Sequence, residues 1–535
     1  MRQTHSYSWM FLTLFAVACG NAPKSELSAL TTPSGLSVDQ PELESEPVVS
    51  LAAINGGANS ANAGYFAAPI NWPLVAVHAS TLPNGKILTW ASNDPEGNRS
   101  GEYLVNKTSS AVDLWDPRAD THTRVDNTSN GQELFCSGHA LNANGQLIVT
   151  GGNNGVVPGK GFSGANTTFS YNAFQNTWSR LPNMSEGRWY PTVTSLPNGE
   201  VVTMGGANLA GDGTNLIPEV LKRDNTWRTL GTADISGKTA ALYPWNHVAP
   251  NGQLFSSGPD SSMAYLDTNG TGNWSAPKFR DNLYRFYGTS VMFDTGKLLV
   301  LGGGTSSALT VDLNNNAAVA NTASMSTSRT FMNATVLPNG HVFVNGGNTD
   351  SDLNSDANSV FSSETWNPNT QQWTVGASAS VPRNYHSTAL LLPDGRVLTT
   401  GSRMCGTGCA LNHLNAEIYY PPYLFQKNGS GELAPRPRIR AYSGSAQIGS
   451  GREFYLYTPD QTAEISRVTM IRMGSTTHAF NMDQRFLEIN FRRYDGNWLV
   501  ASSPSNANIA PPGYYLTFVV NNAGVPSVGR IIRLR

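Results

Sequence analysis

The chain has 535 residues, of which only 13% are charged, and its formal net charge is −2. This balance, without any run of Lys or Arg, argues against nucleic acid or an anionic membrane surface as the partner. The 52 glycines and 31 prolines favour a protein with many turns and few long helices.

The amino terminus has the features of an export signal. Arg2 precedes an apolar run that ends at Ala18, and the Ala-Val-Ala sequence at 16–18 suits cleavage by a signal peptidase. The same residues before Cys19 are similar to a bacterial lipoprotein box, so Cys19 is also a candidate lipid anchor. The run is too short to span a bilayer, and no later segment has 18 uninterrupted apolar residues. We therefore expect no transmembrane span.

These features predict an exported protein, either secreted or held at the cell surface. Residues 1–18 are the predicted signal peptide. Residues 19–64, rich in Ser, Ala and Gly, are the predicted flexible tether.

A short phrase, in which a turn that ends in Gly leads into an apolar strand, occurs seven times between residues 82 and 402. Two copies read LPNGKILTW at 82–90 and LPNGEVVTMGG at 196–206. Asn-Gly and Asp-Gly are favoured in tight hairpin turns, because these turns need positive φ. The spacing of about fifty residues is that of kelch-type propeller blades. The sequence therefore predicts a seven-bladed β-propeller over residues 65–432 of an all-β protein.

Equivalent offsets in the repeats occupy equivalent places in a propeller, so the residues nine positions before each turn glycine should face the axis on one side. In chain order these ring residues are Ala76, Cys136, Tyr190, Tyr243, Tyr287, Phe331 and His386. Because cysteine, tyrosine and histidine can bind metals or form radicals, we expect the functional site in this ring. Aromatic residues at the start of inner strands are often packing residues, and we assign Tyr243, Tyr287 and Phe331 to packing or to the wall of a pocket.

The pattern changes after residue 432. Short strand-like segments such as REFYLYTP and GYYLTFVVN follow one another over about a hundred residues. They predict an immunoglobulin-like β-sandwich over residues 433–535. A polar loop at 474–481 contains His478, which taken alone is typical of a solvated surface histidine.

Two of the four cysteines form a close pair. Cys405 and Cys409 stand in CGTGC, and an exported protein allows a small disulfide between them. Zinc is the competing interpretation, but no second cysteine pair is available to complete such a site. Cys136 is then unpaired. It is either a buried thiol that packs as a small hydrophobe or, given its place in the ring, a functional residue.

Several segments resemble the copper radical oxidases of the galactose oxidase and glyoxal oxidase group. FCSGHALNANGQLIVTGG and GRWYPTVTSLPNG are similar to the cysteine and radical-tyrosine motifs of that family. RNYHS, LLLPDGRV and PPYLF also match, as do STTHAFNMDQR and PPGYYLTFVVNNAGVPS near the carboxyl end. The resemblance extends from residue 68 to Arg535, and the order of its motifs makes it specific.

The resemblance implies one copper ion held by Tyr190, Tyr385, His386 and His478, with the sulfur of Cys136 bonded to the ring of Tyr190. Cu(II) favours nitrogen and oxygen donors in tetragonal geometry, with positions open for substrate. The metal charge lowers the pKa of a bound tyrosine, and a thioether on the ring makes a Tyr190 radical easier to form and hold. Copper and radical together supply two redox equivalents, so no organic cofactor is needed.

The implied reaction is a two-electron oxidation of a small aldehyde or primary alcohol, coupled to reduction of O2 to H2O2. Tyr385 is the expected general base for the substrate hydroxyl, and the Tyr190 radical is the expected acceptor of hydrogen from the substrate carbon. Tyr190, Cys136 and Tyr385 are thus the predicted catalytic residues. We expect the enzyme to be a monomer.

The sequence departs from galactose oxidase near the expected substrate. The tryptophan that stacks over the cross-linked ring there falls on Asn208, and an arginine used there for sugar hydroxyls falls on Pro244. Trp189, in RWYPT, is instead similar to the glyoxal oxidase branch. A small aldehyde such as glyoxal or methylglyoxal, or a simple primary alcohol, is therefore expected in place of galactose.

Two other functions stay open on the sequence alone. A non-catalytic relative could use its propeller and sandwich to bind surface glycans or a cell-wall partner, and would have no copper affinity. A mononuclear copper protein without the radical would bind copper but keep Cys136 as a free thiol. Four other histidines lack a ligand motif and are expected to be structural: His78, His139, His247 and His413.

Overall fold

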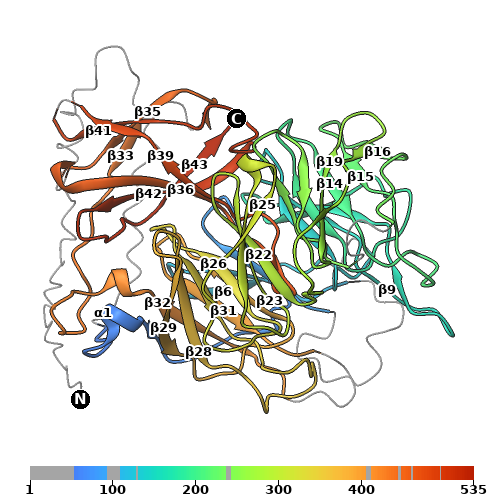
Figure 1. Ribbon diagram of the computed structural model, residues 1–535, viewed down its shortest axis with the longest axis horizontal. Coiled ribbons are helices and arrows are strands. Elements are labelled where there is room, and N and C mark those ends of the chain that lie inside the picture. The colour runs from blue at the N-terminus through green and yellow to red at the C-terminus, as the bar shows by residue number, and fades with distance from the viewer. Residues whose placement is uncertain are drawn as a thin grey trace, which may run out of the picture.

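The computed structural model of the chain describes residues 54–92, 109–127, 131–236, 242–404, 411–443, 447–459, 462–494 and 496–535. The predicted signal peptide, the lipid-anchor candidate Cys19, most of the tether and the Cys405–Cys409 pair lie outside these residues. The described residues form an all-β protein with a large body of sheets and a smaller C-terminal group of strands, drawn in orange and red in Figure 1. No helix among them is long and apolar enough to cross a bilayer.

The large body consists of seven antiparallel sheets that follow one another along the chain, as the repeat predicts. The first two sheets contain β3 (His78–Thr81), β4 (Ile87–Trp90), β5 (Val112–Asp116) and β6 (Thr121–Arg124), and then β7 (Gly138–Leu141), β8 (Leu147–Thr150), β11 (Thr168–Asn172) and β12 (Thr177–Leu181). The third and fourth contain β13 (Thr192–Ser195), β14 (Val201–Met204), β15 (Glu219–Leu221) and β16 (Trp227–Thr229), and then β17 (Asn246–Val248), β18 (Leu254–Ser256), β19 (Ser262–Asp267) and β20 (Asn273–Trp274). The last three contain, in order, β22 (Gly288–Asp294), β23 (Lys297–Gly302), β24 (Ala308–Asp312) and β25 (Ala318–Asn321); β26 (Asn333–Val336), β27 (Val342–Asn345), β28 (Ser362–Asn367) and β29 (Gln372–Ser378); and β30 (Ser387–Leu391), β31 (Val397–Gly401) and β32 (Asn415–Tyr420). This is the seven-bladed β-propeller that the sequence predicts.

The repeated turn connects the first two strands of each sheet. All seven turn glycines have φ between 69° and 86°, the left-handed region that the turn requires. In the first copy the N–H of Gly85 donates to the carbonyl of Leu82 at 2.8 Å, which closes the turn before β4 begins. The local turn chemistry therefore fixes where each pair of inner strands reverses.

The amino-terminal segment completes the seventh sheet. Strand β1 (Tyr65–Phe66) pairs antiparallel with β32 and places Tyr65 opposite Tyr420. β2 (Ile70–Asn71) pairs with the same strand, after the short helix α1 (Ser60–Ala63). On the inner side, β3 of the first sheet lies beside β30 of the seventh. The first and last repeats are thus neighbours in space.

The C-terminal strands form a two-sheet sandwich, as predicted. One sheet contains β33 (Ala441–Ser443), β35 (Glu453–Tyr457), β41 (Trp498–Ser502) and β40 (Phe491–Arg493); the other contains β34 (Gln447–Ile448), β43 (Arg530–Leu534), β42 (Gly513–Asn521), β36 (Ile465–Arg472) and β39 (Phe486–Ile489). Alternate apolar side chains from both sheets, among them Phe454 and Val519, are buried in a core separate from that of the propeller. The boundaries 65–432 and 433–535 themselves stay a prediction.

A hairpin of the C-terminal part enters the propeller. Its strands are β37 (Ser475–Thr477) and β38 (Phe480–Asn481), and β37 pairs antiparallel with β3, with Thr477 opposite His78. β37 also contacts inner strands β7 and β30, whereas β38 contacts β22 and β26. Because these are inner strands of five different blades, the hairpin occupies the axis of the propeller. Its tip carries His478 to the ring residues.

Candidate metal centre

Six of the seven ring residues have a left-handed backbone, with φ between 42° and 69°. They are Cys136, Tyr190, Tyr243, Tyr287, Phe331 and His386. This conformation costs a non-Gly residue about 1–3 kcal/mol. Hydrogen bonds between neighbouring blades offset the cost: the N–H of Tyr190 donates to the carbonyl of Cys136 at 3.0 Å, and that of Tyr243 to the carbonyl of Tyr190 at 2.8 Å. The shared backbone turn explains why one sequence offset collects side chains at one place.

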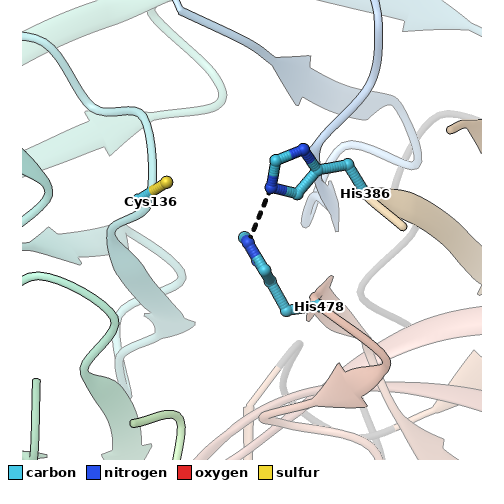
Figure 2. A group of neighbouring side chains, drawn as sticks. All are labelled: Cys136, His386 and His478. Atoms are coloured by element: carbon cyan, nitrogen blue, oxygen red, sulfur yellow. Dashed lines mark hydrogen bonds between the residues drawn. The ribbon is translucent and has the colours of Figure 1, made fainter. Parts of the chain in front are cut away.

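Two imidazole rings meet beside the cysteine of the ring. Nε2 of His386, just before β30, lies 2.8 Å from Nε2 of His478, just after β37. Figure 2 shows the two rings pointing at each other, with Cys136 on the facing loop. The Sγ of Cys136 and a ring nitrogen of each histidine lie within 4.8 Å of one another. Propeller and hairpin thus contribute to the same cluster.

The outer nitrogen of each ring has an acceptor of its own. Nδ1 of His386 lies 2.8 Å from the carbonyl of Arg403, which can only accept. Nδ1 of His478 lies 2.7 Å from Oγ1 of Thr477, whose hydrogen is donated to the carbonyl of Val77 at 2.9 Å. Both rings therefore carry hydrogen on Nδ1 and present the lone pairs of Nε2 to each other. Two facing lone pairs repel, and a cation held by both removes the repulsion. The donor set fits a metal ion.

Burial keeps these imidazoles in the neutral form that binds metals. It lowers the pKa of His386 to about 3. The pKa of His478 also lies well below its ordinary value, first because the ring is buried and second because His386 is so close.

Two tyrosines complete the arrangement. The hydroxyl of Tyr190 lies 2.5 Å from the hydroxyl of Tyr385, and the ring of Tyr385 stacks on that of His386 with centroids 3.8 Å apart. Burial raises the pKa of both phenols well above the ordinary value. The phenols are therefore protonated in the absence of a metal, whereas a bound divalent cation acts in the opposite direction and favours the phenolate.

Cys136 is buried and forms no disulfide. Burial raises the pKa of its thiol, and hydrogen bonds to the side chains of Tyr190 and Trp189 oppose that effect. The sulfur therefore lies next to the side chains of both Tyr190 and Trp189. The structure brings together all five residues that the sequence singled out: Cys136, Tyr190, Tyr385, His386 and His478.

Comparison with known proteins agrees with this geometry. The sequence-family model for the glyoxal oxidase N-terminus matches residues 120–292 and 304–423. The family model for the galactose oxidase-like Early set domain matches residues 436–534. The chain belongs to the galactose oxidase and glyoxal oxidase family.

Relatives within this family cover most of the chain. It is 32% identical to a galactose oxidase of Gibberella zeae over 92% of its own length and 75% of that protein. It is 29% identical to an aldehyde oxidase of Arabidopsis thaliana over 75% of its own length and 71% of that protein. Among solved structures, a copper-bound fungal alcohol oxidase of the AA5 family covers 88% of this chain and all of that chain with a TM-score of 0.80 and 28% identity.

An aromatic stack covers Tyr190 in this family member. The indole of Trp189 lies parallel to the Tyr190 ring at a centroid distance of 3.6 Å, and Phe162 stacks on the other face of the indole at 4.3 Å. Phe162 belongs to a short hairpin of β9 (Asn153–Val156) and β10 (Phe162–Gly164), inserted between strands of the second blade. Trp189, which the sequence compares with the glyoxal oxidase branch, therefore lies over the ring of Tyr190. Asn208 is instead hydrogen-bonded to Asp212.

A partly buried ion-pair network holds the carbonyl that orients His386. Ser402, Arg403 and Met404 have φ of 103°, 91° and 70°, three successive left-handed residues just after β31. The guanidinium of Arg403 donates to a carboxylate oxygen of Asp356. Nε2 of His413 lies 3.0 Å from the other oxygen of that carboxylate. Sequence reasoning missed this network, because no motif links Asp356 to residues about fifty positions away.

A cavity of about 240 Å³ opens beside the two tyrosines. Its lining residues are Phe135, Cys136, Asn153, Phe162, Trp189, Tyr190, Tyr287, Leu353, Tyr385 and Met404. Tyr287 is thus a wall residue, as expected. Pro244, where the sequence places the sugar-binding arginine of galactose oxidase, does not line it.

The other histidines lie outside the donor set. Nε2 of His78 accepts the N–H of Cys136 at 3.0 Å, and so helps to hold the backbone of that cysteine. His247, in the fourth blade, is hydrogen-bonded to Ser290 of the fifth blade at 2.5 Å. His139 is buried against Trp90. These contacts agree with the structural roles expected for them.

Proposed function

We propose that this chain is a copper radical oxidase that oxidises a small primary alcohol or aldehyde by two electrons and reduces O2 to H2O2. The observation that carries the proposal is the pair of Nε2 lone pairs on His386 and His478. The two Nε2 atoms lie 2.8 Å apart, beside the paired hydroxyls of Tyr190 and Tyr385. Two imidazoles and two phenols are a donor set suited to Cu(II).

His386, His478, Tyr190 and Tyr385 are the proposed ligands, and copper held by them would polarise the substrate oxygen and accept one of two electrons. Tyr385 accepts the proton of the substrate hydroxyl, and its neighbour Tyr190, as a radical, takes a hydrogen atom from the adjacent carbon. The short distance between the two phenol oxygens lets both transfers occur on one substrate molecule. Overall, RCH2OH and O2 give RCHO and H2O2.

Cys136 and the aromatic stack are proposed to stabilise the radical. A thioether from Cys136 to the Tyr190 ring would enrich that ring in electrons. Trp189 covers the ring face at 3.6 Å and excludes water from it. Both residues contact Tyr190 itself, so their effect should appear in its oxidised form.

Oxygen consumption and peroxide release by copper-loaded protein test the proposal. Tyr385→Phe should retain copper and lose most turnover, because it keeps the ring and removes the basic oxygen. Tyr243→Phe is a matched control in the same ring, since that hydroxyl donates to the carbonyl of Ser137 at 3.0 Å. A folded protein with no affinity for copper would overturn the proposal and favour the non-catalytic glycan- or cell-wall-binding module.

We also propose that the protein is exported and acts as a monomer, on the strength of the amino-terminal segment and the self-contained site. Intact-mass analysis of the protein from its native host distinguishes cleavage after Ala18 from lipidation at Cys19. The disulfide between Cys405 and Cys409 is proposed on their spacing alone, and thiol counting under denaturing conditions tests it.

A further inference from the structure

The cavity beside Tyr190 and Tyr385 limits the kind of substrate that the site accepts. This inference rests on the proposed oxidase function. Apart from the tyrosines, Cys136 and Asn153, its wall is made of the apolar side chains of Phe135, Phe162, Trp189, Leu353 and Met404. Phe135 and Met404 are buried at its inner side. Phe162, 37% exposed, forms part of the mouth. A substrate that reaches Tyr385 must therefore place the rest of its structure against apolar surface.

The polar groups that border this wall are engaged with one another. Nδ2 of Asn153 donates to the carboxylate of Glu133 at 3.0 Å, and its Oδ1 accepts the N–H of Gly155 at 3.1 Å. Arg403 lies behind the wall, where its guanidinium donates to the carbonyl of Leu353 at 2.7 Å and to Asp356. Within the described part of the chain, the cavity is lined by no charged side chain. A sugar or a carboxylate would lose hydrogen bonds to water on entry and find few replacements.

The volume of the cavity also limits the size of the substrate. An apolar protein cavity of about 150 Å³ holds a benzene molecule, and this one measures about 240 Å³. A single aromatic ring or a chain of about six carbons therefore fits beside the two tyrosines. Phe162, which stacks on Trp189 and is partly exposed, adds an aromatic side chain to the lining that such a group would contact.

We infer that the preferred substrates are primary alcohols, and the corresponding aldehydes, whose oxidised carbon carries an alkyl chain or an aromatic ring. Each methylene that moves from water onto the wall should raise kcat/KM about fourfold, the equivalent of burying one CH2. Glyoxal, which is hydrated in water, and galactose present hydroxyls to the same wall and gain nothing comparable. The reaction is that of the proposed oxidase, in which RCH2OH and O2 give RCHO and H2O2.

A substrate series on the copper-loaded, full-length enzyme tests the inference. Oxygen uptake would be measured with ethanol, 1-butanol, 1-hexanol, benzyl alcohol, glycerol, galactose and glyoxal. The expected result is a rise in kcat/KM on the order of a hundredfold from ethanol to 1-hexanol, with benzyl alcohol near the top. A higher kcat/KM for glycerol, galactose or glyoxal than for 1-hexanol would overturn the substrate class while leaving the oxidase function intact. No uptake with any compound would overturn the oxidase function and the substrate class with it.

Phe162→Ala separates specificity from general damage. This variant should lower the ratio of kcat/KM for 1-hexanol to that for ethanol, because it removes part of the wall that only the longer substrate contacts. Phe174→Ala is the matched control: Phe174 is 66% exposed between β11 and β12 of the same blade, away from the cavity lining. An unchanged hexanol-to-ethanol ratio in Phe162→Ala, with activity retained, would contradict the assignment of this wall to substrate.

Discussion

Replacing Thr477 by Val tests the arrangement that makes His478 a ligand. The hydroxyl of Thr477 accepts from Nδ1 of His478 at 2.7 Å and donates to the carbonyl of Val77 at 2.9 Å. Valine keeps the shape of the side chain and removes both bonds. Loss of a partner that orients a metal-binding histidine weakens metal affinity about 10–100-fold, or about 1.4–2.8 kcal/mol. The lost bond to Val77 should also reduce the free energy of unfolding by about 1 kcal/mol.

The measurement is the copper dissociation constant, obtained by competition with a chelator of known affinity. Thr476→Val is the matched control on the same buried strand, because its hydroxyl bonds to the carbonyl of Phe480 at 3.4 Å and touches neither histidine. Thr477→Ser restores a hydroxyl and should recover most of the affinity. Equal copper affinity in Thr477→Val and Thr476→Val would show that this hydroxyl does not fix the tautomer of His478.

Three further predictions follow from neighbouring contacts. Trp189→Ala should leave copper content unchanged but shorten the lifetime of the oxidised enzyme, followed by its radical absorption; an unchanged lifetime would remove the shielding role. Asp356→Asn should weaken copper binding about tenfold, because it loosens the Arg403 carbonyl that holds His386, and affinity equal to the parent protein would contradict this. Burial lowers the pKa of His247 to about 3, so the unfolded chain binds a proton that the folded chain does not. Stability of the copper-free protein should then fall as pH drops from about 6.5 toward 4, by at most about 1.4 kcal/mol per pH unit for this group. In His247→Gln the free energy of unfolding, measured by urea titration, should depend less steeply on pH than in the parent protein. An equally steep dependence would contradict this prediction.

The repeat was readable from the sequence because its determinants are local. A turn such as Asn84-Gly85 needs only its own residues to adopt positive φ, so seven copies predict seven blades. The same regularity predicts that Cys136, Tyr190 and His386 lie near one another, since one backbone turn recurs at each ring position. The place of His478 came from a resemblance, because nothing in its polar loop indicates that the loop enters the propeller.

The remaining features depend on contacts between distant parts of the chain. The hairpin β37–β38 pairs with β3 across about four hundred residues, and no local pattern specifies that pairing. Phe162 reaches Trp189 only because a short hairpin folds back over the blade, and Asp356 meets Arg403 through a loop between two strands. Ser402, Arg403 and Met404 have left-handed backbones that their residue types disfavour. Only the completed structure shows the carbonyl that this backbone directs to His386.

The most direct test of the radical mechanism is peptide mass spectrometry of protein treated with copper in air. The radical mechanism predicts that the peptides containing Cys136 and Tyr190 appear joined, with a mass lower by two hydrogens than the sum of the two. Separate peptides, with a Cys136 thiol that can be alkylated after unfolding, would contradict it. That result in a protein that still binds copper would instead indicate a mononuclear copper site without the radical.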